Sequence, residues 1–221
     1  MAKTGVEIRP AHLSDAPPIA EIIMRVWPTS QNESRRSTDL ITQIEAGLSQ
    51  ADHRAFVAAD GPRVVGFVDS FPSQNRWELD LLAVDPDYHG RGIAGELIAA
   101  SDEAGRAAGF FLTRALVQVE NDPMMRALSR MGYSSDQKPQ TLYVCDGGLA
   151  AVDAASLLPV HTLTYEGAWI EGEVIESDES SLTPGTVVGK VVDHEDHTTR
   201  TTLERLAFEA LDHYCWWVKT L

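Results

Sequence analysis

The chain is poor in positive charge and in cysteine, and it contains no long apolar run. Lys and Arg number 18 against 33 Asp and Glu, which gives a net charge of −15. Binding of nucleic acid requires a basic stripe to neutralise phosphates, so we expect no nucleic-acid partner. No apolar run approaches the roughly 20 residues of a membrane helix, and the N-terminus does not resemble a signal peptide. We therefore expect a soluble, cytoplasmic protein with no membrane partner.

Cysteine usage and the histidines give little sign of a metal site. The two cysteines, Cys145 and Cys215, lack metal-ligand or CxxC spacing, which favours reduced structural thiols. The run Asp193–His197 combines two histidines with three carboxylates, but it has no spaced partner. We expect a solvated acidic turn there and no metal, with metal binding as the alternative.

One stretch, Leu79–Gly109, combines a strand, a glycine loop and a helix. The apolar run Leu79–Val84 is bounded by Asp85-Pro86, which favours a buried strand. The glycine-bearing segment 89–95 follows, and it leads into a helical pattern of small and apolar residues that ends near Gly109. The first amides of a helix lack intrahelical acceptors and lie at the positive end of its dipole. A diphosphate could therefore bind at residues 90–95, whereas a simple tight turn is the alternative.

The loop resembles the pyrophosphate loop of the GNAT superfamily of acyl-CoA-dependent N-acyltransferases. That family's pattern is Q/R-x-x-G-x-G/A, and segment 89–94 (HGRGIA) matches its spacing with His89 in the first position. A second family signature places an Asn after the next strand, with Gly and an aromatic residue eleven and twelve positions later. Asn121, Gly132 and Tyr133 fit this spacing. The resemblance covers roughly residues 6 to 145.

The resemblance implies an α/β (α+β) fold: a mixed, mostly antiparallel sheet with a splayed parallel strand pair, flanked by helices. The residue patterns predict strands near 6–10, 55–59, 64–71, 79–84, 110–119 and 141–146. They predict helices near 16–26, from about 33 or 38 to 48, and near 93–108 and 123–131. We expect an acyltransferase domain over residues 1–146. Residues 147–221 carry 13 acidic and 4 basic residues and are predicted to form an acidic C-terminal β/α extension.

Within that extension, residues 161–175 read as a strand or bent hairpin, 187–192 as a strand and 176–183 as a loop. Helical spacing over 200–219 predicts a terminal helix that ends in Trp216-Trp217. Such an aromatic end requires burial, and the extension could pack on the domain, line the acceptor site or form a homodimer interface.

Acetyl-CoA is the co-substrate that the resemblance implies. Its binding residues would be the backbone at Leu82, Ala83 and Val84, the amide of Asn121, and the loop. The loop positions are His89, Gly90, Arg91, Gly92, Ile93, Ala94 and Gly95. An amide at 82–84 would also stabilise the oxyanion that forms during acyl transfer.

Two carboxylates, Glu78 and Asp80, stand at the head of the central strand and are the candidate catalytic residues. Alternation places both on one face with Leu82. An amine must lose a proton before it attacks a thioester, and Glu78 stands where many GNAT enzymes carry a general base. Alternatively, both carboxylates could pair with Arg76 or Arg114. The acceptor would be a small-molecule or peptide amine, bordered by residues 27–36, where Trp27, Arg35 and Arg36 could touch substrate.

Leu128 departs from the family pattern, because most catalytic members have a Tyr there that protonates the CoA thiolate. Tyr88, Ser129, Tyr143 or water could donate instead. The leading hypothesis is N-acetylation of a primary amine by direct attack in a ternary complex. The alternative is a catalytically weak acyl-CoA-binding or regulatory module of the same fold.

Overall fold

The computed structural model describes residues 5–27, 33–146, 160–163, 171–175 and 187–221. Backbone contacts divide the chain into two compact units. The first comprises Met1–Leu116, Asp122–Ser134 and Trp217–Leu221, and the second comprises Val117–Asn121 and Ser135–Trp216. The predicted division into an acyltransferase domain over residues 1–146 and an extension over residues 147–221 stays a prediction.

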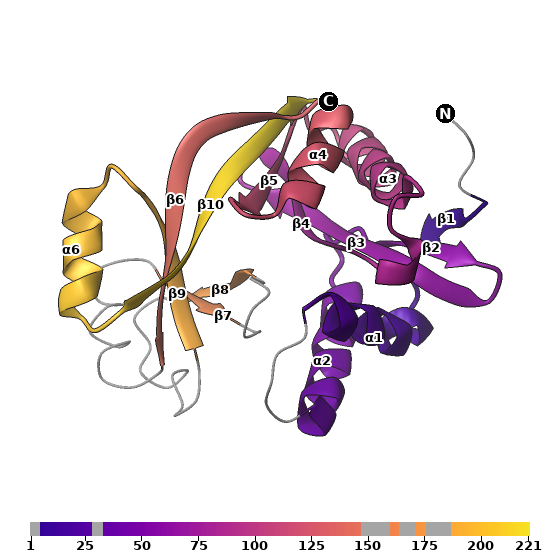
Figure 1. Ribbon diagram of the computed structural model, residues 1–221, viewed down its shortest axis with the longest axis horizontal. Helices are drawn as coiled ribbons and strands as arrows, with labels where there is room; N and C mark the ends of the chain where they lie inside the picture. The colour runs from indigo at the N-terminus through magenta and orange to yellow at the C-terminus, as the bar shows by residue number, and fades with distance from the viewer. Residues whose placement is uncertain (1–4, 28–32, 147–159, 164–170, 176–186) are drawn as a thin grey trace. The chain divides into compact units, whose positions relative to one another are not determined.

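The chain combines helices and strands (Figure 1). In order they are β1 (Glu7–Pro10), η1 (Leu13–Asp15), α1 (Ala16–Val26), α2 (Glu33–Leu48), β2 (Phe56–Asp60), β3 (Arg63–Ser73), β4 (Arg76–Val84), η2 (Pro86–Tyr88), α3 (Ile93–Ala107), β5 (Leu112–Gln118), α4 (Asp122–Arg130), β6 (Ser134–Asp146), β7 (Val160–Leu163), β8 (Glu171–Ile175), β9 (Val187–Asp193), α6 (His197–Arg205) and β10 (Glu209–Thr220). None of the described helices is long and apolar enough to cross a bilayer.

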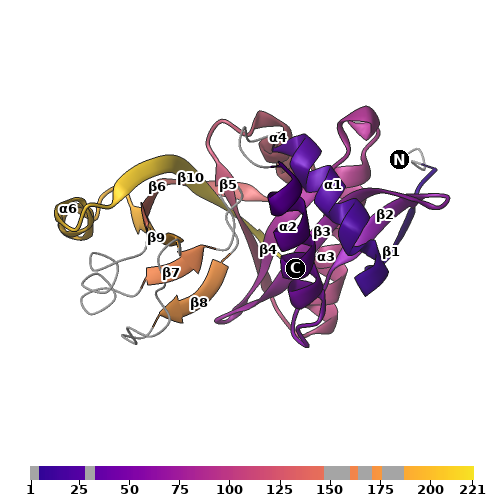
Figure 2. The ribbon, with the colours of Figure 1, turned by 90° about the horizontal axis from the view of Figure 1, so that it is seen from below.

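The sheet of the first unit has the strand order β1-β2-β3-β4-β5. Its first three pairings are antiparallel, and β4 pairs with β5 in parallel. The parallel ladder joins Trp77–Leu79 to Thr113–Ala115, whereas β4 continues to Val84. Helices α1 and α2 lie on one side of this sheet, and α3 and α4 lie on the other (Figures 1 and 2). The expected mixed, mostly antiparallel sheet with one parallel pair is confirmed.

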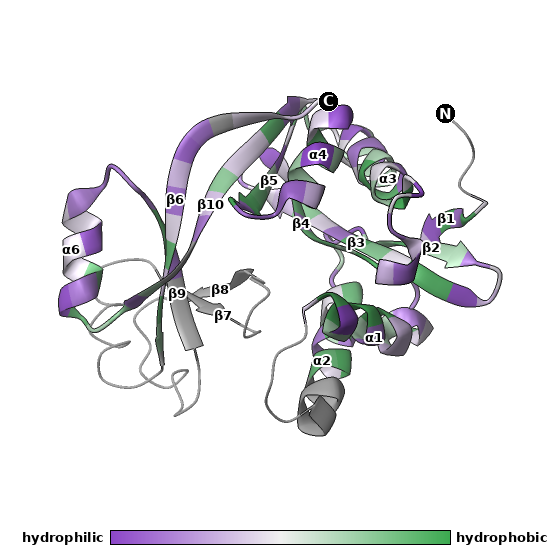
Figure 3. Cartoon of the chain, in the orientation of Figure 1, coloured by the Kyte–Doolittle hydropathy of each residue, from purple (hydrophilic) through white to green (hydrophobic). Residues whose placement is uncertain are grey.

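Apolar residues on α1, α3 and the central strands, green in Figure 3, include the buried side chains that form the core of the first unit. Ile19 and Ile23 on α1, and Leu97 on α3, are fully buried, as their helical spacing predicts. Helix α3 packs closely on β3 at Gly66, where an added Cβ would lie 3.1 Å from Leu97 Cδ1. This close approach fixes the start of α3 beside the end of β4.

A β-bulge in β4 overturns one detail of the predicted alternation. Asp69 opposes Leu81 and Ser70 opposes Leu79, so Asp80 is the extra residue. Residues directly opposite each other share a face, so Leu82, opposite Val68, lies with Leu79 and not with Glu78. The prediction that Glu78, Asp80 and Leu82 share a face is therefore wrong for Leu82, because the bulge shifts the alternation by one residue.

The second unit contains strands in the order β10-β6-β9-β7-β8, with α6 preceding β10. The predicted strands and hairpin of the extension are present, since β7 pairs antiparallel with both β8 and β9. The predicted terminal helix over 200–219 is wrong beyond Arg205, because residues 209–220 form strand β10. The predicted loop at 176–183 and the acceptor-bordering residues 28–32 lie outside the described residues, as do the side chains of Arg35 and Arg36.

Candidate functional site

The glycine loop between η2 and α3 has a left-handed backbone at two of its glycines. Gly90 and Gly92 have φ values of 76° and 86°, which favour glycine, and Gly92 is the N-cap of α3. A Cβ built on Gly90 would have no atom within 4 Å, so the approach to the loop is open there. Ile93 is buried beneath the first turn, whereas Gly90, Arg91 and Gly92 are exposed. The loop thus exposes backbone at the positive end of α3.

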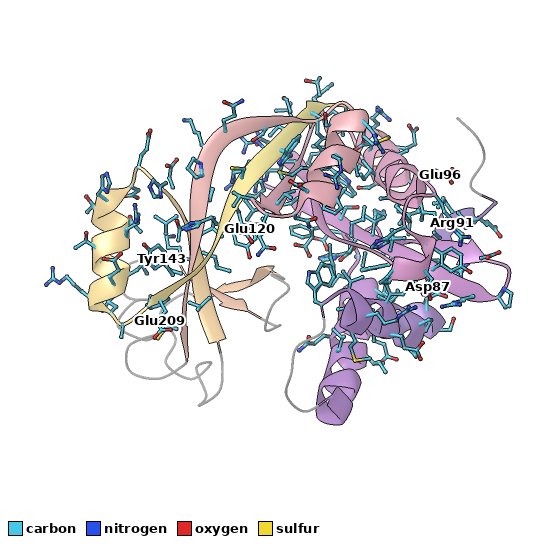
Figure 4. The ribbon with its side chains drawn as sticks, viewed as in Figure 1. Asp87, Arg91, Glu96, Glu120, Tyr143 and Glu209 are labelled. Atoms are coloured by element: carbon cyan, nitrogen blue, oxygen red, sulfur yellow. The ribbon has the colours of Figure 1, made fainter. Side chains whose placement is uncertain are left out.

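His89 ties this loop to the end of the central strand. Its Nε2–H donates to the carbonyl of Val84 over 2.8 Å. Arg91 lies across the Tyr88 ring at 4.3 Å and donates to the Asp87 carbonyl, and Figure 4 shows Asp87 and Arg91 on the same side of the first unit. These contacts hold the loop without occupying the glycine backbone.

Buried Asp85 anchors the turn from below. Its carboxylate accepts from Arg25 at 2.6 Å and Arg63 at 2.8 Å, and from the Asp87 amide at 3.0 Å. Arg25 also pairs with Asp87, and this hydrogen bond lowers the pKa of the Asp87 carboxyl. The ion pairs connect α1, β3 and the turn, and so fix the geometry of the loop.

The amides at the end of β4 alternate in direction. The Asp85 amide donates to the Val65 carbonyl of β3, so alternation directs the Ala83 amide to β3 as well. The Leu82 and Val84 amides consequently point to the β5 side, where the parallel ladder has already ended at Leu79. Of the three predicted acyl-holding positions, Leu82 and Val84 have the direction that an oxyanion hole requires.

Glu78 is buried and paired with a cation. Its side chain is 2 % exposed, and Arg114 Nε donates to its Oε2 over 2.7 Å. Arg114 also donates to Ser73 Oγ at 3.0 Å. The sequence left open a pairing with Arg76 or Arg114, and the partner is Arg114. A carboxylate committed to an arginine is a poor proton acceptor, because protonation would leave the arginine uncompensated.

Asp80 is half-buried and occupies the β4 bulge. Bulges often reorient a side chain next to an active site. Asp80 therefore differs from Glu78 in both exposure and backbone setting, although the sequence pattern treated them as equivalent.

Asn121 lies in the second unit, directly after β5. Its side chain is half-buried, and its backbone N–H donates to the Gln118 carbonyl at 2.9 Å. The other two residues of that signature belong to the first unit, where Gly132 has a φ of 86°. The Tyr133 hydroxyl donates to Asp102 at 2.6 Å, and burial followed by the Asp102 charge raises the pKa of Tyr133. Gly132 and Tyr133 therefore contribute to structure.

Leu128 is fully buried in α4, so the departure from the family pattern is accommodated in the core. Among the alternative proton donors, Ser129 is exposed on α4, and Tyr88 donates to Asp60 at 2.9 Å. Tyr143 is buried in the second unit, where it donates to Glu204 and accepts from Arg200 (labelled in Figure 4).

In the described residues, no group of three or more His, Cys, Asp or Glu side chains could hold a metal ion. Within the late acidic run, Asp196 caps α6 by accepting from the Thr199 amide. Asp193 accepts from the Glu195 amide at 2.9 Å. These carboxylates stabilise a turn and a helix start.

Comparison with known proteins identifies the class. The acetyltransferase (GNAT) family matches residues 17–133, which is more than half of the chain. The protein therefore belongs to the GNAT acetyltransferase family. This confirms the resemblance drawn from the two motifs, and it supports acetyl-CoA as co-substrate. No curated protein matches the chain.

Solved structures share the fold at low sequence identity. A Pyrococcus horikoshii protein, provisionally classed as an acetyltransferase, has a TM-score of 0.66 and 10% identity over 100% of this chain and 91% of its own. A tandem GNAT protein from the clavulanic acid biosynthesis pathway has a TM-score of 0.63 and 14% identity, covering 97% and 98%. The PaiA N-acetyltransferase of Thermoplasma acidophilum, solved with coenzyme A, has a TM-score of 0.52 and 17% identity, covering 59% and 91%.

The structure contains a histidine–carboxylate pair that the sequence patterns did not predict. His53 Nδ1 lies 2.8 Å from Asp69 Oδ2, and the His53 ring stacks on Phe71 at a centroid distance of 4.9 Å. Asp69 lies inside the apolar run 64–71, and an acidic residue in a buried strand was the signal that could have revealed it.

Proposed function

We propose that the protein transfers an acetyl group from acetyl-CoA to a primary amine by direct attack in a ternary complex. The observation that carries this proposal is the open loop at Gly90–Gly92 next to the outward-pointing amides of Leu82 and Val84. In this arrangement residues 89–95 would bind the pyrophosphate, and the two amides would hold the acyl oxygen. The bound T. acidophilum relative supports the coenzyme assignment.

Of the two candidate carboxylates, we assign the amine to Asp80. Its half-buried position in the bulge supports contact with an ammonium group, whereas Glu78 is committed to Arg114. We assign Glu78 to charge balance beneath the site. Asn121 remains our proposed ligand of the pantetheine arm.

A catalytically weak acyl-CoA-binding module is the second candidate, and buried Leu128 favours it. Such a module would bind acetyl-CoA through the same loop without transferring the acetyl group. The two candidates therefore differ in turnover and not in binding.

The test separates the two steps. Binding is measured as thermal stabilisation by acetyl-CoA, and transfer as thiol release with a panel of primary amines, for wild type, Glu78→Gln and Asp80→Asn. We expect stabilisation in all three, amine-dependent release in wild type, and the larger loss of release in Asp80→Asn. Stabilisation without release from any amine would select the binding module.

A matched pair of glycine variants tests the loop. Gly90→Asp places a negative charge at the proposed phosphate site, and Gly61→Asp places one in the β2–β3 turn. Both positions have positive φ and no atom within 4 Å of an added Cβ. We expect Gly90→Asp to weaken acetyl-CoA binding by about tenfold or more, because like charges repel, and Gly61→Asp to leave it unchanged. Equal affinities would contradict the loop assignment.

A further inference from the structure

His53 and Asp69 form a preorganised pair on the sheet face that carries Glu78. Asp69 and Phe71 alternate along β3 with Ser70 between them, and Phe71 is directly opposite Glu78. Asp69 opposes Leu81, immediately after the bulge residue Asp80 and one residue before Leu82. The pair therefore lies on the face of the sheet that carries Glu78 and Leu81, one strand away from the β4 segment whose Leu82 and Val84 amides define the proposed acyl position.

The position of His53 is set by its neighbour Arg54, which forms two hydrogen bonds with Ser70 of β3. The Arg54 amide donates to the Ser70 carbonyl at 2.7 Å, and Ser70 Oγ donates back to the Arg54 carbonyl at 2.9 Å. Ser70 Oγ in turn accepts from Ser101 Oγ, which accepts from Trp77 Nε1, and both serines are fully buried. Phe71 supports the ring by stacking. The imidazole is thus fixed by backbone, packing and carboxylate together.

The carboxylate determines which ring nitrogen can accept a proton. Asp69 is an acceptor when ionised, so Nδ1–H of His53 must be the donor, and Nε2 of the neutral ring then carries the lone pair. Among the described residues Nε2 has no hydrogen-bond partner, and 16% of the His53 side chain is exposed. Asp69 Oδ1 also accepts from the Ser70 amide at 2.8 Å, so the carboxylate is itself held in place. This is the arrangement by which a carboxylate orients a histidine for base catalysis.

From this geometry we infer that His53 Nε2, oriented by Asp69, is the general base that takes a proton from the acceptor ammonium. The inference rests on the proposed function. The ammonium gives one proton to Nε2, and the amine nitrogen forms a bond with the acetyl carbonyl carbon. The C–S bond breaks, coenzyme A leaves as the thiolate and takes the second proton, and the amide nitrogen retains the third. Imidazolium then returns its proton to solvent, and Asp80 holds the cationic substrate without accepting the proton.

The charges around the ring suit this role. Burial lowers the pKa of His53, but the hydrogen bond and charge of Asp69 and the charge of Asp52 outweigh burial, so the pKa lies above the usual value. Glu78 on β4 lies on the same face of the sheet and is paired with Arg114. A base whose pKa is higher than that of an ordinary carboxylate accepts a proton from an ammonium more effectively.

The experiment compares His53→Gln and Asp69→Asn with wild type, and uses His194→Gln, at an exposed position in the second unit, as the control. For a strongly basic amine we expect His53→Gln to lower kcat/KM by about a hundredfold at neutral pH, with unchanged stabilisation by acetyl-CoA. The wild-type pH profile should rise through the His53 ionisation, and this limb should disappear in His53→Gln but persist in His194→Gln. The loss should shrink as the amine becomes less basic, since a neutral nucleophile needs no prior deprotonation.

A purely structural role would give equal losses for all amines and leave the pH limb in place, and either result overturns the inference. Nitrogen-15 NMR of the imidazole provides a readout that does not depend on turnover. The inference requires a neutral His53 protonated at Nδ1, with chemical shifts that change in Asp69→Asn, and a proton on Nε2 in the neutral ring would refute it. Wild-type protein that binds acetyl-CoA, has the Nδ1–H tautomer and acetylates no amine would refute the proposed function and the role of His53 as base together. Turnover with an unchanged limb in His53→Gln would refute only the base.

Discussion

At the scale of single residues, the buried acids of the first unit all contact cations. Glu78 contacts Arg114, Asp85 contacts Arg25 and Arg63, and Asp102 accepts from Lys219 at 2.6 Å. Removal of one partner from a buried pair costs more than the pair itself contributes, because the remaining charge has lost its compensation. These pairs therefore make the first unit sensitive to single charge changes.

Arg114→Met should show this sensitivity. We expect a loss of about 3–5 kcal/mol in the free energy of unfolding, since the substitution removes the cation that buried Glu78 contacts. Arg106→Met is the control, because Arg106 pairs with Glu103 on the exposed side of α3, where ion pairs contribute about 0–1 kcal/mol. Urea unfolding of both variants provides the values. Similar losses in the two variants would contradict the prediction.

Features of the candidate site were predictable from the sequence where they depend only on a residue and its neighbours along the chain. The glycine loop was predictable because positive φ and an open backbone approach depend on glycine itself. The partner of Glu78 and the pairing of His53 with Asp69 were not, because both depend on which strands lie side by side. Spacing along the chain carries no information on contacts across 16 or 36 residues.

At the scale of elements, the two wrong predictions concern the end of a helix and the alternation of a strand. In both places the backbone changes conformation at a residue other than glycine or proline, so the sequence contains no signal for the change. Helix α6 ends at Arg205, and Ala207, two residues further on, has a φ of 63°, the left-handed conformation that a glycine usually supplies after a helix. With Ala in that position, the apolar spacing continued into Tyr214 and Trp216 and predicted one long helix. The bulge at Asp80 likewise has no glycine to mark it. Helix α1 was predictable because Pro17 and Pro18 mark its start. Helix α3 was predictable because Gly92 precedes its first residue and Gly109 follows its C-terminus.

The start of α1 gives a prediction about pH. The N-cap residue Asp15 accepts from Arg9 at 2.7 and 2.8 Å, and this hydrogen bond, opposed by burial and aided by the His12 amide, lowers the pKa of the Asp15 carboxyl. A lowered pKa in the folded state stabilises the fold above the unfolded-state value of about 3.9. That stabilisation is lost as the pH falls through the folded-state pKa.

Asp15→Asn should therefore be less stable than wild type near neutral pH, by about 1–3 kcal/mol, and the difference should vanish in acid. Thermal or urea unfolding across acidic and neutral pH measures it. Asp122→Asn serves as control, because Asp122 is exposed and contacts Arg126 at 3.4 Å. A difference that is constant with pH would contradict the ionic role of Asp15.

At the scale of the whole molecule, the chain returns to its first unit at its very end. Residues Trp217–Leu221 belong to the first unit, although Ser135–Trp216 belong to the second. The Leu221 amide donates to the Phe111 carbonyl at 2.9 Å, and Lys219 contacts Asp102 beneath the Tyr133 ring. The last residues are thus part of the core structure of the acetyltransferase fold.

A chain that ends at Trp216 should be destabilised by at least about 3 kcal/mol, because buried Asp102 loses its cation and the Phe111 carbonyl loses its backbone partner. Lys219→Met should reproduce much of this loss, and Lys138→Met, at an exposed position in the second unit, should not. Denaturant unfolding of the three proteins checks the ranking. A truncated chain as stable as wild type would show that the tail is dispensable.

The place of Lys219 and Leu221 has a consequence for biosynthesis. A ribosome makes residues 217–221 after all the other residues of the first unit, so most of that unit emerges before the contacts that complete its fold can form. Translation products that stop short of the C-terminus would retain the loop sequence at 89–95 but lack the contacts that lock Asp102. We expect cellular quality control to recognise such products as unstable proteins. A domain fused after Leu221 would need a linker that preserves the hydrogen bond between Leu221 and Phe111.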